Sequence, residues 1–130
     1  MMKIKIYQIN HERDRQRLEF MNFAFVVRRT KTDRIQAEIY DCVYEGEVSC
    51  KSLESVYALF NVRKPKDYQQ RALSISDVVE VLESDSVPRG TYFCDSFGFK
   101  EVVFAHSKEA RESLMREQDS QREDRDREER

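Results

Sequence analysis

The sequence is poor in the residues that build the most familiar enzyme sites. Its only glycines are Gly46, Gly90 and Gly98, and none lies in a GxGxxG or GxxxxGK pattern, which excludes the usual phosphate-binding loops. The two histidines are His11 and His106, and neither lies near Ser74 or Ser76 in sequence, which also lack a GxSxG turn. A catalytic triad needs a base that a third group orients. We therefore expect no catalytic residue, no metal and no cofactor.

Cysteines and long apolar runs are also scarce. The three cysteines, Cys42, Cys50 and Cys94, are an odd number without CxxC spacing, which argues against a zinc site and a disulfide framework. We expect reduced thiols, with Cys42 and Cys94 as small buried residues in strands. No apolar run approaches the ~20 residues that span a bilayer. Because no signal peptide is evident, the sequence predicts a cytoplasmic protein.

Charge is abundant but nearly balanced, with 23 basic and 25 acidic residues. Seven of these basic residues and nine of the acidic ones lie in residues 107–130, where apolar residues are few. The remainder has the composition of an ordinary soluble domain. The sequence thus predicts one domain over residues 1–106, followed by a charged extension over 107–130 that is either helical or disordered.

Hydrophobic periodicity predicts an α+β fold, with a mostly antiparallel sheet of about five strands and two helices packed on one of its faces. The helix at 20–29 rests on apolar residues with helical spacing, namely Phe20, Phe23, Ala24 and Val27. Alternation of Ile4 and Ile6 with Lys3 and Lys5 predicts a half-buried strand, with the lysines at an exposed sheet edge. The expected strands are 2–9, 39–46, 78–83, 91–95 and 99–104, and the second helix is 52–61.

Two carboxylates in the last third of the chain admit two interpretations. Asp77 precedes the apolar run VVEV, and Asp95 precedes the turn SFG. As an acid–base pair they would have to converge in a pocket, with the pKa of one of them shifted. Alternatively, each accepts backbone N–H groups of its own turn. The structural interpretation is favoured, because the strand-end positions account for both residues.

Phe97 lies between Ser96 and Gly98 at the tip of a predicted hairpin. An apolar ring there has no obvious core to join, whereas neighbouring aromatic residues can fill the core of a domain without tryptophan. We therefore single out Phe97 for contact with a partner protein. The whole candidate surface comprises Asp77, Asp95, Ser96, Phe97 and Lys100.

Two segments give the chain a resemblance to a known family. LSISDVV (Leu73–Val79), followed by YFCDSFGFKEV (Tyr92–Val102), resembles the YodL-like domain, a small module of mobile genetic elements in Gram-positive bacteria. The similarity extends weakly to IYQIN, VYEGEV and LESVYALFNVRKPKDYQQR and covers residues 4–104. Cys94 departs from the pattern, in which an aliphatic residue precedes the aspartate, and the charged extension lies outside it. The resemblance implies no established enzyme activity, only a context of mobile DNA.

These observations lead to two functional hypotheses. In the first, the protein is a non-enzymatic, protein-binding accessory of a mobile element, whose partner is a protein of the host or the element. The most concrete version is an inhibitor of a bacterial defence nuclease, of the anti-CRISPR or anti-restriction type. In the second, it is a nucleic-acid-binding module of replication or transfer machinery. Its phosphate-facing surface would then use the cations that follow each predicted helix, namely Arg28, Arg29, Lys31, Arg34, Arg63, Lys64 and Lys66.

Overall fold

The computed structural model describes residues 1–105, in which a six-stranded sheet lies between two short α-helices. The predicted α+β class is confirmed. His106 and the predicted extension 107–130 lie outside the described residues. Within residues 1–105 no helix has the length and apolar character needed to cross a bilayer. In chain order the elements are β1 (Met2–Ile9), η1 (His11–Arg13), α1 (Phe23–Thr30), β2 (Arg34–Gln36), η2 (Ala37–Ile39), β3 (Tyr40–Val48), α2 (Leu53–Val62), β4 (Val78–Ser84), β5 (Gly90–Cys94) and β6 (Phe99–Ala105).

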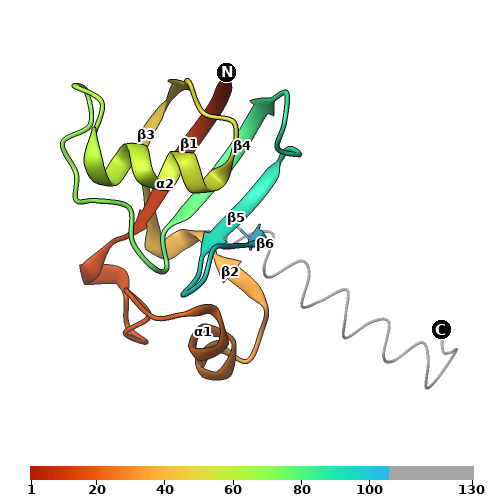
Figure 1. Cartoon of the computed structure of the whole chain (residues 1–130). Helices are drawn as coiled ribbons and strands as arrows, with labels where there is room; N and C mark the ends of the chain where they lie inside the picture. Colours follow the sequence, from red (N-terminus) through yellow and green to blue (C-terminus); the bar gives the residue numbers. More distant parts are fainter. Residues whose placement is uncertain (106–130) are drawn as a thin grey trace, which may run out of the picture.

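The sheet is mixed, with strand order β2-β6-β5-β4-β1-β3 (Figure 1). All neighbours pair antiparallel except β2 and β6, which run parallel. Sequence periodicity missed β2 because three residues are too few to establish alternation. The prediction that β1 is a sheet edge is wrong, since β1 lies between β3 and β4. Its lysines occupy an outward face opposite glutamates: Lys3 pairs in register with Glu47 and Glu83, and Lys5 with Glu45 and Glu80.

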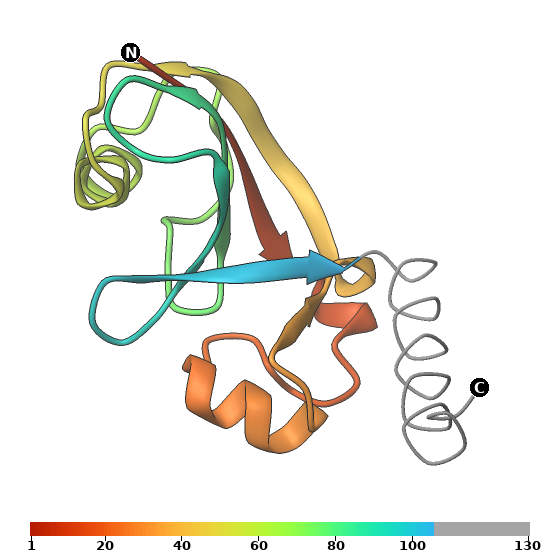
Figure 2. The same cartoon turned by 90° about the vertical axis from the view of Figure 1, so that its right-hand side faces the viewer.

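The helices cover opposite faces of this curled sheet, so the prediction that both cover one face is wrong (Figure 2). Adjacent strand residues point to opposite faces. Val79 packs in the cluster that contains Phe60 of α2, whereas Val78 packs in the cluster that contains Val26 of α1. The sheet is therefore the shared layer of two cores. Each core is built mainly by one helix and one sheet face.

A β-bulge in β3 explains why a single chain segment contributes to both cores. Ile6 pairs with Tyr44 but Tyr7 pairs with Cys42, so Val43 is the extra residue. The bulge inverts the alternation. Tyr44, after the bulge, consequently faces α2, and its ring lies 5.0 Å from that of Phe60. Tyr40, before the bulge, packs in the α1 core. Tyr40 and Tyr44 therefore pack in different cores, and Cys42, which we predicted to be buried, is exposed.

Helix α1 begins later than its apolar spacing suggests. Asn22 caps it, with the side-chain oxygen accepting the N–H of Phe25. This capping geometry is typical of asparagine. Phe20 therefore lies before the helix, in a left-handed backbone conformation with φ of 70°, and is half-exposed. The buried helix residue is Val26, and Ala24 points to solvent.

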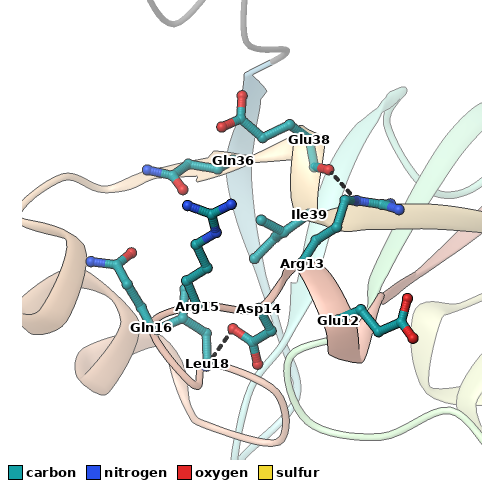
Figure 3. Close-up of a pocket in the computed structure, with 9 residues that line it drawn as sticks. All are labelled: Glu12, Arg13, Asp14, Arg15, Gln16, Leu18, Gln36, Glu38 and Ile39. Carbon is teal, nitrogen blue, oxygen red and sulfur yellow. Dashed lines mark hydrogen bonds between the residues drawn. The ribbon is translucent and has the colours of Figure 1, made fainter.

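Side chains hold the segment between β1 and α1 against η2 and fix its own turns (Figure 3). The Nε group of Arg13 donates to the carbonyl oxygen of Glu38 at 2.8 Å. The carboxylate of Asp14 accepts the N–H groups of Leu18 and Glu19 at 2.8 and 2.9 Å. An open polar groove of about 640 Å³ lies between these segments. The loop is thus fixed by many local bonds, although it contains no glycine.

Candidate functional site

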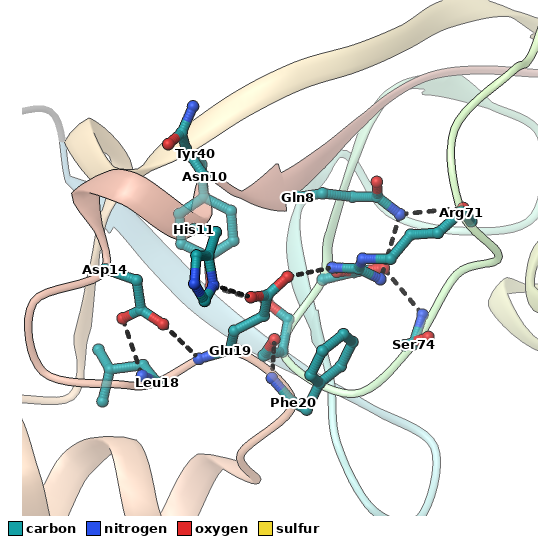
Figure 4. A network of polar contacts seen from close by, with 12 residues as sticks. Gln8, Asn10, His11, Asp14, Leu18, Glu19, Phe20, Tyr40, Arg71 and Ser74 are labelled. Atoms are coloured by element: carbon teal, nitrogen blue, oxygen red, sulfur yellow. Dashed lines mark hydrogen bonds and ion pairs between the residues drawn. The ribbon is translucent and has the colours of Figure 1, made fainter.

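Asp77 lies at the centre of a buried polar network. Figure 4 labels its partners Gln8, Arg71 and Ser74. Its side chain is fully buried, and its two oxygens each accept one N–H of the Arg71 guanidinium, at 2.8 and 3.0 Å. Oδ2 also accepts the Ser74 N–H at 2.8 Å and Gln8 Nε2 at 3.1 Å. Such a fork of two parallel bonds is the strongest arrangement for an arginine and a carboxylate. Direct contact of Asp77 with a partner is excluded in this conformation.

The network extends from the core to the surface through Arg71. The guanidinium lies 3.6 Å from the Glu19 carboxylate and stacks over the Phe20 ring at 4.7 Å. Glu19 in turn lies 3.4 Å from His11, which is exposed. Three segments distant in sequence therefore meet here: β1, the segment before α1 and the segment before β4. The network fixes two loops against one strand end.

Ser76 ties the same region to the β5–β6 hairpin. It is fully buried with φ of 83°, a conformation that costs a non-glycine residue energy. Hydrogen bonds by all three polar groups of Ser76 offset this cost. Its N–H donates to the Cys94 carbonyl, its hydroxyl oxygen accepts the Phe20 N–H at 2.9 Å, and its carbonyl accepts the Tyr40 hydroxyl at 2.7 Å. Thus the LSISD segment, which lies in the first of the two motifs of the family resemblance, forms a structural junction.

Burial dominates the ionisation of the groups around this junction. Desolvation raises the pKa of Asp77, while the bonds and charge of Arg71, the Ser74 N–H and Gln8 lower it in part. Desolvation also raises the pKa of Tyr68 to about 12, assisted by the negative charge of Asp77. The Asp77 carboxylate is fully buried and accepts hydrogen bonds from Arg71, Ser74 and Gln8.

Asp95 has a different structural task. One oxygen accepts the Ser96 N–H at 2.8 Å and the N–H of Phe23, the first residue of α1, at 3.0 Å. Its own N–H donates to the Gly98 carbonyl at 2.9 Å, which closes the hairpin. Each of the two carboxylates therefore accepts a backbone N–H of its own turn. This geometry matches the structural interpretation of the pair.

The hairpin tip presents Phe97 to solvent. Its side chain is 97% exposed, the highest value among the large apolar residues of the described chain. Gly98 follows with φ of +78°, a backbone conformation that glycine readily adopts. A pocket of about 290 Å³ adjoins the tip and is lined from α2 by Glu54 and Tyr57 and from the other segments by Ile75, Cys94, Asp95, Ser96, Gly98 and Phe99. Tyr57 was not among the candidate residues from the sequence, although 40% of it is exposed.

The predicted cations fall into two groups that do not share a surface. Arg28, Arg29, Lys31 and Arg34 follow α1, and Arg63, Lys64 and Lys66 follow α2. Because the two helices pack on opposite faces of the sheet, the groups lie far apart in the fold (Figure 1). A single phosphate-facing patch of all seven residues, as the sequence suggested, is therefore not formed.

The network also contains residues that the sequence analysis did not select. Gln8 shares the inward face of β1 with Ile4 and Ile6, and it is 5% exposed. A polar residue at a buried position of an alternating strand predicts a buried hydrogen-bonding partner, and this signal could have identified it. Arg71 had a weaker signal, since a spacing of six residues before Asp77 in a loop indicates no particular geometry.

The thiols give a first test of the structure. Cys50 and Cys94 are buried and Cys42 is exposed. Burial, with the charges of Asp77 and Asp95, raises the pKa of Cys94 to about 12. Because the thiolate is the reactive form, we expect iodoacetamide at pH 8 to modify Cys42 alone in the native protein and all three thiols in urea. Peptide mass mapping distinguishes them, and rapid native labelling of Cys94 would contradict the fold. The described residues contain no cluster of histidine, cysteine or carboxylate ligands suited to a metal.

Comparison with known protein families finds a match to the sequence. The model of the YodL-like domain matches residues 3–104, which is nearly the whole described chain. No curated protein and no solved structure matches the sequence.

Proposed function

The chain belongs to the YodL-like domain family, and we propose that it acts as a non-enzymatic binding protein whose hairpin tip inserts into a partner protein. The exposure of Phe97 carries this proposal. Burying a phenylalanine side chain is worth about 1.5–3 kcal/mol, so a fully exposed ring forgoes that stabilisation until it meets an apolar pocket. Aromatic anchors of this kind dominate many protein interfaces.

The tip is suited to binding because it is already ordered. Asp95 joins the hairpin to the first N–H of α1, and Gly98 closes the turn. A pre-organised anchor loses little conformational entropy on association. Ser96 and Lys100 are exposed beside it and complete the contact surface, whereas Asp95 positions the tip. Asp77 contributes only indirectly, through the junction that supports Cys94.

The adjoining pocket makes the surface two-sided. Its wall includes the half-exposed Tyr57 and its floor includes Ile75 and Phe99. A volume of about 290 Å³ accommodates one large side chain of the partner. The partner would thus receive Phe97 and offer an apolar side chain in return. The most concrete partner is a host defence nuclease, which a mobile element gains from inhibiting.

The proposal predicts that F97D abolishes partner capture while leaving folding intact. Val62 provides a matched control, because it is also an exposed apolar residue, at 78%, but lies at the end of α2. Tagged wild type, F97D and V62D should be compared by pull-down from nuclease-treated host lysate. A protein retained by wild type and V62D, and lost with F97D, is expected.

A functional readout completes that test. Wild type and V62D, but not F97D, should protect an incoming plasmid in a host with an active restriction or CRISPR nuclease. If F97D retains the same partner and protects equally, the tip is not the binding surface.

A further inference from the structure

The structure adds Arg15 and Arg17 to the cations that follow α1, and we propose that the resulting basic surface binds the backbone of single-stranded nucleic acid. The surface, here called the arginine patch, comprises Arg15, Arg17, Arg28, Arg29 and Lys31. All five side chains are exposed, and none makes an ion pair with another residue of the described chain. The inference uses different residues from the hairpin tip and stands or falls separately.

A contact between the loop before α1 and the end of α1 brings the patch together. Gln16 Nε2 approaches the Arg29 carbonyl at 3.5 Å, and the Arg29 guanidinium approaches the Gln16 carbonyl at 3.4 Å. Arg15 and Arg17 flank Gln16 in sequence, so they lie beside the cations of the helix. Figure 3 shows Gln16 reaching toward that helix while Arg15 extends into the neighbouring groove.

The simplest structural explanation for cations at this position is the negative end of the helix. The helix dipole explains only some of these cations. A helix C-terminus is equivalent to roughly half an elementary negative charge, whereas the arginine patch carries five positive charges. Within residues 15–33 the carboxylates are Glu19 and Asp33. The Glu19 carboxylate lies near Arg71 and His11. Asp33 makes no ion pair within the described residues. Glu12, Asp14 and Glu38 line the groove that Arg15 enters and balance part of its charge, so the excess of positive charge comes mainly from Arg17, Arg28, Arg29 and Lys31.

The chemistry of the patch fits phosphodiesters. Guanidinium groups bind phosphate oxygens through paired donors. The guanidinium groups of Arg28 and Arg29 lie over the Phe25 ring, 5.9 and 4.9 Å from its centroid. The cations form an open track over a loop and a helix, not an enclosed pocket, which suits a chain of phosphates better than one mononucleotide.

Phe20 favours a single strand over a duplex. Its ring is 52% exposed and adjoins Arg15 and Arg17 in a shallow pocket of about 480 Å³. Arg71 covers one face of the ring at 4.7 Å. An aromatic ring beside a line of cations is the arrangement on which unpaired bases stack. The bases of a duplex are already stacked on each other and cannot use it.

The test measures fluorescence polarisation of a fluorescein-labelled 20-nucleotide oligo-dT with the full chain, between 25 and 200 mM KCl. Wild type should bind with a dissociation constant on the order of 10⁻⁶ to 10⁻⁴ M and weaken steeply with salt. R17Q/R28Q/K31Q should bind on the order of tenfold more weakly, with the slope of log K against log salt reduced by about 2. F20A should weaken binding by about tenfold with an unchanged slope.

The charge-matched control is R63Q/K64Q/K66Q, which removes three cations from the end of α2 and should bind like wild type. Equal losses in both triple variants would overturn the proposal in favour of a net-charge effect. Absence of binding at 25 mM KCl with 100 µM protein would also overturn it. So would patch-dependent sedimentation with phosphatidylglycerol vesicles without oligonucleotide binding, which would identify a membrane surface instead. The same polarisation assay is repeated with a labelled 20-base-pair duplex. Tighter binding to this duplex than to the single strand would contradict the role of Phe20.

Discussion

Replacing Arg71 by alanine is expected to lower the unfolding free energy by about 3–5 kcal/mol at pH 7. The variant leaves the Asp77 carboxylate fully buried and without its counter-ion, with only the Ser74 N–H and Gln8 Nε2 as donors. Breaking a buried pair from one side costs this much because the remaining charge is neither solvated nor compensated. For a domain whose total stability is about 5–15 kcal/mol, the loss is large.

The pH dependence of the R71A deficit identifies its cause. Burial raises the pKa of Asp77 in the folded state above its unfolded value, and the Arg71 bonds and charge oppose that rise. A raised folded pKa gives a contribution that favours folding at low pH and is lost as pH rises through that pKa. Removing Arg71 raises the folded pKa further. The deficit of R71A relative to wild type should therefore shrink as pH falls from 7 toward 5.

Urea unfolding of four proteins at both pH values provides the measurement: wild type, R71A, D77N and R71A/D77N. The double variant carries no buried charge, so it should be more stable than R71A at pH 7, and its difference in stability from D77N should not depend on pH. A deficit of R71A that is equal at pH 5 and pH 7, and that D77N does not relieve, would show that Arg71 contributes by packing on Phe20 alone.

The sequence predicted the elements well where a pattern is local. Strands β1, β3, β4, β5 and β6 and helix α2 all begin and end within two residues of their predicted bounds. The hairpin tip was also found from sequence, because Gly98 and the adjacent polar residues define a turn regardless of the rest of the chain. Phe97 is exposed as expected.

The failures all concern information that periodicity does not carry. The bulge at Val43 inverts a face, and no local signal distinguishes it from regular alternation. Lys3 and Lys5 indicate an outward face, but a face pattern does not say whether a strand has one neighbour or two. The prediction placed the start of α1 at residue 20 because Phe20 has helical spacing. Asn22, which caps the helix, is the better signal for its start. The arginine patch depends on a tertiary contact, which sequence spacing cannot show.

The two core clusters raise the question of whether they unfold together, and F60A and F93A are expected to answer it. Phe60 is fully buried in the α2 core, where it contacts the rings of Tyr44 and Tyr68 at 5.0 and 4.9 Å. Phe93 is fully buried in the α1 core, 5.6 Å from the ring of Phe23. Each truncation removes a large apolar group and leaves a cavity, which costs about 3–5 kcal/mol.

We expect both variants to destabilise the whole domain in one transition. The reason is that β1, β4 and β5 contribute alternate residues to both cores, as the neighbours Val78 and Val79 do. A strand cannot lose one face without disturbing the backbone pairing that presents the other. Native-state amide exchange should show uniform loss of protection across β1 and β4 in F60A and in F93A alike. V62A, which truncates an exposed side chain, should leave protection unchanged. If F93A instead releases only α1, β2 and β6 while the α2 core keeps wild-type protection, the two cores are separate cooperative units, and the sheet does not couple them.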